Sequence, residues 1–86
     1  MTDPSPWQPL GAELADARRR TTLTQHAIAR QLGISQAAYS QIERGMIRPQ
    51  PALLGRLAIV LGMDVGRLSE LADHPLERVL TMLMVG

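Results

Sequence analysis

The sequence contains no cysteine and no phenylalanine, and all nine of its basic side chains are arginine. The absence of cysteine excludes disulfide bonds and thiolate metal sites. Aromatic residues make up 2% of the 86 residues and hydrophobic residues 45%, so we expect a core of Leu, Ala, Ile, Val and Met. These residues favour helix, and no alternating strand pattern is present. The sequence therefore predicts a single, all-α domain.

Long apolar runs are scarce as well. The longest one, Leu57–Leu61, is far too short to span a bilayer, and the N-terminal residues lack a signal-peptide pattern. We therefore expect a soluble, cytoplasmic protein that makes no contact with membranes.

Residues suited to catalysis or metal binding are also few. The two histidines, His26 and His74, lie far apart and have no acidic cluster at metal-ligand spacing. Ser35 and Ser40 have no plausible base beside them, and no glycine-rich phosphate loop occurs. We therefore expect no metal, no cofactor and no enzymatic activity.

Two short helices separated by a tight turn are predicted in the first half of the chain. Thr24 is a capping residue for a helix over Gln25–Leu32, whose apolar residues recur at helical spacing. Gly33 ends this helix, because glycine adopts a left-handed C-terminal conformation without steric cost. Ser35 then caps a second helix over Gln36–Arg44. Two helices joined by so short a turn must cross steeply, which defines a helix-turn-helix unit.

The second of these helices has two unlike faces when it is projected at about 100° per residue. One face carries apolar side chains that can pack on the preceding helix, and the other carries no acid. In a major groove, glutamine pairs bidentately with adenine and an alanine methyl group contacts thymine. We therefore predict that the polar face contacts DNA bases. The alternative interpretation is that this face is exposed to water and has no binding role. The expected base contacts are Gln36, Ala37, Ser40 and Gln41.

The distribution of charge is more informative than the net charge of +1. Residues 18–48 contain six arginines and one acidic residue, Glu43, so the excess positive charge lies on the helix-turn-helix and its flanks. Contacts with phosphate require such a distribution. The expected phosphate contacts are Thr24 and Gln25 at the start of the first motif helix, and Arg44 and Arg48 around the proline-containing loop after the second.

A family resemblance is carried by residues in a fixed order, namely Gln25, Ile28-Ala29, Leu32-Gly33-Ile34-Ser35, Tyr39-Ser40, Ile42-Glu43-Arg44-Gly45 and Pro49. Together they resemble the Cro/CI-type (XRE-family) helix-turn-helix DNA-binding domain, and the likeness extends more loosely from Leu10 to Leu71. The resemblance implies a compact, lambda-repressor-like bundle of about five helices that binds operator DNA, usually as a homodimer. It also implies a transcriptional regulator of a bacterium or phage, located at the nucleoid and most simply a repressor that occludes a promoter.

The resemblance further implies an ion pair between Arg18 and Glu43. Arg18, at the end of the first helix, resembles a cation of the family that pairs with the glutamate of the Ile-Glu-Arg-Gly ending. Arg18 closely follows the apolar stripe of its helix, where a charge needs a partner. The alternative is a solvated arginine within an arginine-rich run.

Outside the motif, the chain divides into parts of different composition. Residues 1–8 are expected to form a flexible arm, in which Trp7 either folds back on the domain or belongs to a surface for a partner. Residues 9–72 are expected to form the helix-turn-helix domain. Its further helices are predicted over residues 9–20, 52–61 and 65–72.

Residues 73–86 predict a sixth, C-terminal helix with an apolar stripe. The five-helix domain does not require this helix, and an apolar stripe exposed to water favours association. The stripe either folds back on its own bundle or pairs with a second copy. Pairing is preferred, because one motif makes few base contacts and two half-sites about 34 Å apart supply more. The expected dimerisation residues are Leu76, Val79, Leu80 and Leu83.

Two other functions stay open at this point. One is an antitoxin that binds DNA to regulate its own gene and covers a toxin with its C-terminal segment. The other is a protein-interaction module that has the same fold, presents its last helix to another protein and does not bind DNA. Co-purification of a small protein encoded by the adjacent gene would indicate the antitoxin. Absence of salt-sensitive DNA binding would indicate the interaction module.

Overall fold

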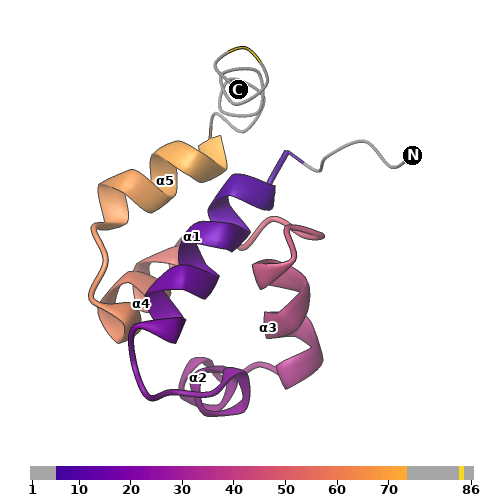
Figure 1. Cartoon of the computed structure of the whole chain (residues 1–86), viewed down its shortest axis with the longest axis vertical. Helices are drawn as coiled ribbons and strands as arrows, with labels where there is room; N and C mark the ends of the chain where they lie inside the picture. Colours follow the sequence, from indigo (N-terminus) through magenta and orange to yellow (C-terminus); the bar gives the residue numbers. More distant parts are fainter. Residues whose placement is uncertain (1–5, 74–83, 85–86) are drawn as a thin grey trace.

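A computed structural model of the chain describes residues 6–73 and residue 84. The described residues form five α-helices and no strands, in agreement with the predicted all-α class (Figure 1). One helix has the predicted bounds, and the ends of the other four lie within one residue of them. None of the five has the length and apolar content needed to cross a bilayer. They are α1 (Gln8–Arg19), α2 (Gln25–Leu32), α3 (Gln36–Glu43), α4 (Pro51–Leu61) and α5 (Val65–Asp73).

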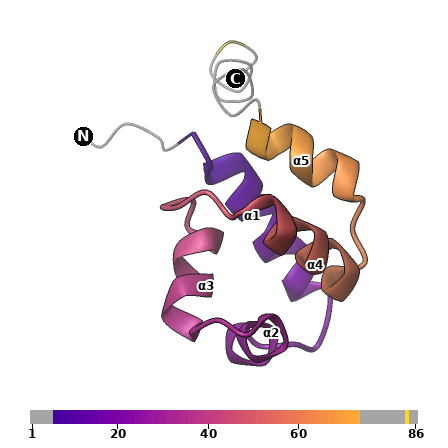
Figure 2. The ribbon, with the colours of Figure 1, turned by 180° about the vertical axis from the view of Figure 1, so that it is seen from behind.

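Helix α1 crosses the middle of the bundle, between α3 on one side and α5 on the other (Figures 1 and 2). Helix α3 packs on α1 and α2, and α4 packs on α5, α2 and α1. The steep arrangement expected for α2 and α3 is visible in both views, where α2 is seen nearly end-on beside the upright α3. The outer side of α3 therefore faces away from the rest of the described helices.

Capping groups at both helix ends hold the short turn between α2 and α3. Gly33 has a φ of 72°, and the N–H of Ile34 donates to the carbonyl of Ala29 at 3.0 Å. This hydrogen bond belongs to a Schellman motif, in which a residue other than glycine is strained by the positive φ. At the start of α3, Oγ of Ser35 accepts a hydrogen bond from the N–H of Ala38 at 3.0 Å. Both helix ends are thus determined by local residues, as predicted.

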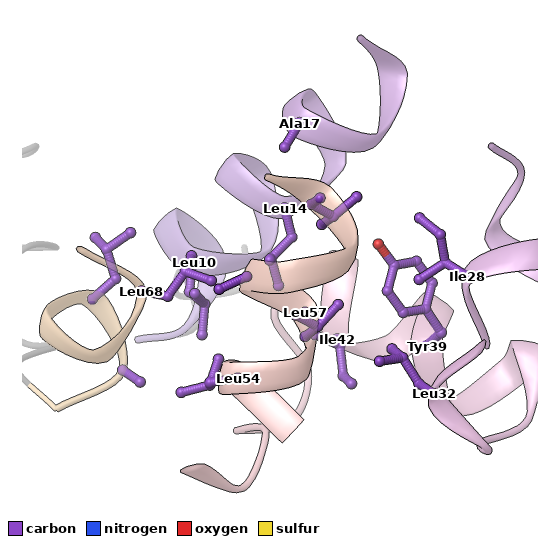
Figure 3. Close-up of a cluster of buried hydrophobic side chains, with 14 of the residues drawn as sticks. Leu10, Leu14, Ala17, Ile28, Leu32, Tyr39, Ile42, Leu54, Leu57 and Leu68 are labelled. Carbon is purple, nitrogen blue, oxygen red and sulfur yellow. The ribbon is translucent and has the colours of Figure 1, made fainter. Parts of the chain in front are cut away.

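One core of mainly aliphatic side chains holds the helices together (Figure 3). Tyr39 is the one aromatic residue among the buried ones, and it lies close to Ile28 and Leu32. Full burial of one such side chain contributes roughly 1.5–3 kcal/mol. The buried residues of this core are Leu10, Leu14, Ala17, Ile28, Ala29, Leu32, Tyr39, Ile42, Leu54, Leu57, Ala58, Leu61, Leu68, Leu71 and Ala72, and Leu53 packs partly buried against them.

Helix α1 approaches the end of α3 so closely that two positions require glycine. A Cβ on Gly11 would lie 2.7 Å from the carbonyl oxygen of Ile42, and nearer still to that of Glu43. A Cβ on Gly45, which has a φ of +70°, would lie 2.6 Å from Cα of Gln8. Because these neighbours are backbone atoms, they cannot move aside as the end of a side chain can. The two glycines therefore set the position of α3 against α1.

Several predictions concern the ends of the chain. Trp7 is half-buried, and its carbonyl accepts a hydrogen bond from the N–H of Gly11 at 3.0 Å, while Gln8 already belongs to α1. The predicted sixth helix over residues 73–86 lies outside the described residues, except for Asp73, which ends α5, and Met84. The four predicted dimerisation residues also lie outside them: Leu76, Val79, Leu80 and Leu83.

Candidate nucleic-acid interface

The outer side of α3 is polar and accessible. Among the four residues predicted to contact bases, Gln36 and Ala37 are exposed, and Ser40 and Gln41 are half-buried. The opposite side of the helix packs on α1 and α2. The accessible side therefore presents two amides, a hydroxyl and a methyl group, with no carboxylate among them. These are chemical groups that can read base edges in a major groove.

The carboxylate of Glu43 connects α3 to both helices that support it. Arg18 on α1 donates from Nε to Oε2 at 2.6 Å and from Nη2 to Oε1 at 3.2 Å. Gln25 on α2 donates from Nε2 to Oε1 at 2.8 Å. The side chain of Glu43 is 5% exposed and that of Arg18 is 18% exposed. The ion pair implied by the family resemblance is therefore present and mostly buried, and Gln25 is a second partner of Glu43 that sequence reasoning missed.

These contacts determine the protonation of Glu43. Burial acts to raise the pKa of its carboxyl group, but the hydrogen bonds from Arg18 and Gln25 outweigh burial, and the pKa lies below its ordinary value. Burial and the nearby Glu43 carboxylate raise the pKa of the Tyr39 hydroxyl. At neutral pH Glu43 is therefore negatively charged and Tyr39 is neutral.

The two phosphate candidates at the start of α2 are not equally available. Thr24 is exposed, and its Oγ1 accepts a hydrogen bond from the N–H of Ala27 at 3.0 Å, which leaves the hydroxyl hydrogen free to donate. Gln25 is half-buried, and one of its two amide hydrogens is bonded to Glu43. The first N–H groups of α2 have no acceptor within the helix, so an anion can bind there. Because Gln25 contacts Glu43, this helix end lies beside the end of α3.

The arginines near α3 differ in their partners. Arg44, directly after α3, is exposed and forms no ion pair with a described residue. Arg48, in the loop before α4, has Nη2 at 2.8 Å from Oδ1 of Asp73 at the end of α5. Arg19 forms an exposed ion pair with Asp16 at 2.9 Å. The positive charge around α3 is therefore partly neutralised within the protein, and Arg48 is occupied by Asp73 in this structure.

A further arginine near the motif is absent from the predicted site. Arg56 on α4 donates from Nη1 to the carbonyl of Leu32 and from Nη2 to the carbonyl of Gln31, both at 2.9 Å. The one indication in the sequence is a charged residue within the apolar helix predicted over residues 52–61. Its partners lie 24 and 25 residues earlier in the chain, a separation that local spacing cannot reveal.

The acidic and histidine side chains are the candidates for a metal-binding group in the part of the chain that the structure describes. Its His, Asp and Glu side chains form no group of three that could hold a metal ion. The polar face of α3 and the groups around its two ends are therefore the candidate site.

Two comparisons with known proteins bear on this site. A family model described as a helix-turn-helix domain matches residues 9–71. The "ImmF control region 10 kDa protein" of Bacillus phage phi105 is 38% identical over 56 residues, which are 65% of this chain. Those residues cover 62% of the phage protein, so the chain spans about three fifths of that relative's length. No solved structure matches the chain significantly.

Proposed function

The chain belongs to the XRE-type helix-turn-helix family, and from that membership we propose that it is a sequence-specific, DNA-binding transcriptional regulator. In this proposal α3 lies in the major groove of double-stranded DNA. The protein acts by binding alone, without enzymatic activity. The residues at base edges are Gln36, Ala37, Ser40 and Gln41.

The uncovered polar face of α3 is the observation that carries the proposal. A major groove about 12 Å wide admits one α-helix, provided that no other part of the protein lies in the way. Helix α5 lies on the opposite side of α1 from α3 (Figure 2). Gln36 and Ala37 at the start of α3 are exposed, so their amide and methyl groups can reach adenine and thymine.

Groups at both ends of the motif bind the phosphates that flank the groove. Arg44 and Arg48 contact phosphates beside the end of α3. Other phosphates are contacted at the start of α2, by the hydroxyl of Thr24, the remaining amide hydrogen of Gln25 and the first N–H groups of the helix. Phosphate contacts carry no sequence information, but they fix the register of α3 against the bases.

We propose further that two copies bind a palindromic operator. One α3 reaches few base pairs, and a second copy about 34 Å away, one helical turn along the DNA, adds a second half-site. The proposed contact between copies is the predicted apolar stripe of the C-terminal segment, Leu76, Val79, Leu80 and Leu83. Repression is the simplest result, because a protein bound across a promoter excludes the polymerase. The name of the phage relative refers to a control region, which supports a regulatory role.

Selection of bound sequences from a random DNA pool tests this function. With the full chain at about 100 mM salt, where phosphate contacts are still strong, we expect a two-fold symmetric consensus. An asymmetric consensus would reject the palindromic dimer. No enrichment at all would reject DNA binding and favour the interaction module.

A substitution on α3 then tests the orientation of the helix. Gln36→Ala should weaken operator binding by about 1–3 kcal/mol and relax the preference at one base pair. Gln31→Ala is the matched control, because it removes an exposed amide from α2 instead of α3. Equal effects of the two substitutions would show that α3 is not the helix that reads bases.

A further inference from the structure

Arg56 on α4 completes the hydrogen bonding at the C-terminal end of α2. The last four carbonyl groups of an α-helix have no partner within the helix. In α2, the first two of these four accept hydrogen bonds from N–H groups of the following turn. The other two, on Gln31 and Leu32, accept from the guanidinium of Arg56 at 2.9 Å each. All four carbonyls are therefore bonded, and half of them depend on one side chain from α4.

The position of these hydrogen bonds matters because they lie at the entry to the turn. The carbonyl of Leu32 belongs to the peptide group that joins Leu32 to Gly33, the first residue of the turn. Only Gly33, Ile34 and Ser35 separate α2 from α3, so a rotation of that peptide group changes the direction of α3. A guanidinium is planar and donates two hydrogen bonds in a fixed geometry, which suits it to hold a peptide group in one orientation. Its positive charge is also favourable at the C-terminal end of a helix.

Arg56 also borders a groove between the turn and α4. The groove has a volume of about 450 Å³ and is lined by Ile34, Ala38 and Ile42 on the side of the motif and by Leu53 and Arg56 on the side of α4. Helix α4 packs on α2, and Ile34 and Leu53 pack partly buried against the core, but the groove leaves part of the surface between the turn and α4 open. The two hydrogen bonds of Arg56 are the polar connection across this region.

We propose that Arg56 is a positioning residue for base recognition, which acts through the carbonyl groups of Gln31 and Leu32 and not through contact with DNA. Arg56 holds the turn, and the turn sets the angle of α3 in the major groove of the DNA. This proposal rests on the proposed function, since it assigns Arg56 a role in the reading of bases by α3. It distinguishes Arg56 from Arg44 and Arg48, which the proposed function places at phosphates.

The first test compares operator DNA, obtained by the pool selection, with DNA of unrelated sequence. Arg56→Met keeps an unbranched stem but removes the guanidinium and all its donors. Arg67→Met is the charge-matched control on α5, where Arg67 pairs with Glu13. We expect Arg56→Met to lower operator affinity about three- to thirtyfold more than Arg67→Met. The two variants should bind unrelated DNA equally, with the same salt dependence. Arg56→Lys, which keeps the charge but not the planar pair of donors, should recover only part of the operator affinity.

Equal weakening of operator and unrelated DNA by Arg56→Met, together with a smaller salt dependence, would overturn the proposal, because it would mean direct contact with phosphate. Wild-type operator affinity in Arg56→Met would overturn it as well.

The second test needs no DNA, and it separates failure of this proposal from failure of the proposed function. Amide hydrogen exchange of Gly33 and Ile34, whose N–H groups are bonded to carbonyls of α2, reports on the turn itself. We expect faster exchange at these two amides in Arg56→Met than in Arg67→Met, with unchanged exchange in α1 and α5. Unchanged exchange at the turn would overturn the positioning role even if the wild-type protein binds its operator. Faster exchange in a chain that binds no DNA would support the link to the turn and reject the proposed function instead.

Discussion

Arg18 on α1 binds the carboxylate of Glu43 at the end of α3 through two N–H groups, with Nε 2.6 Å from Oε2 and Nη2 3.2 Å from Oε1. An isolated helix as short as the eight residues of α3 is unstable in water, so its position depends on contacts with its neighbours. The ion pair supplies such a contact close to Gly11, where the backbones of α1 and α3 meet. The polar face of α3 is therefore presented from a fixed support.

Removal of Arg18 should strongly destabilise the protein. Arg18→Ala leaves the carboxylate of Glu43, which is 5% exposed, without its cation, and we expect a loss of about 3 kcal/mol in the free energy of unfolding. Urea denaturation monitored by circular dichroism measures this loss. Arg19→Ala is the matched control, since Arg19 pairs with Asp16 on the surface and should cost no more than about 0.5 kcal/mol. Equal stability of the two variants would show that the ion pair of Arg18 contributes no more than a surface pair.

Stability should also fall in acid because of the same carboxylate. The pKa of Glu43 is lowered in the folded protein, so its contribution is present above the ordinary glutamate pKa of about 4.3 and is lost as the pH falls through the lower, folded value. Glu43→Gln removes this titration, so the variant should lose less stability than the wild type between about pH 6 and pH 3. Urea denaturation across this range measures the difference. A wild-type curve for Glu43→Gln would contradict the assignment.

Local signals explain why the helices were predictable. Thr24 and Ser35 cap their helices through N–H groups three residues away, and Gly33 ends α2 through bonds within the preceding turn. The spacing of the apolar residues in α3 identifies the side that faces the core, and the remaining polar residues then define the outer side. Residues that act across the fold were not predictable in this way. Gly11 looks like an ordinary helical glycine, and Arg56 an ordinary solvated cation, until the distant elements that they touch are in place.

The close approach at Gly11 predicts opposite outcomes for two helical glycines. Gly11→Ala places a Cβ 2.7 Å from the carbonyl oxygen of Ile42, so α1 and α3 must separate, and we expect a loss of about 2 kcal/mol or more. Gly55→Ala in α4 meets no atom within 4 Å and should stabilise the protein by about 0.5–1 kcal/mol, because alanine favours helix. Thermal and urea denaturation of both variants measure the effects. A stabilising Gly11→Ala would show that the two helices are not in contact there.

The ion pair between Arg48 and Asp73 predicts a gain of function. The two side chains are 45% and 56% exposed, so loss of the pair should change stability by less than about 1 kcal/mol. The Asp73→Asn variant should nevertheless bind DNA more tightly. The substitution releases Arg48 for a phosphate and removes a negative charge beside the DNA backbone. Arg48→Ala should weaken binding to all DNA sequences alike. It should also reduce the dependence of the binding constant on salt concentration by the amount expected for about one phosphate contact.

A charge-matched control and a double variant show whether Asp73 acts through Arg48. Glu13→Gln also removes one negative charge, but from the pair with Arg67 between α1 and α5, so its affinity for DNA should stay near the wild-type value. Titration of a labelled DNA duplex at several salt concentrations compares the variants. If Asp73 acts through Arg48, Asp73→Asn should raise affinity far less when Arg48→Ala is already present. An equal gain with and without Arg48 would mean that Asp73 repels DNA directly, and the phosphate contact would then not be assigned to Arg48.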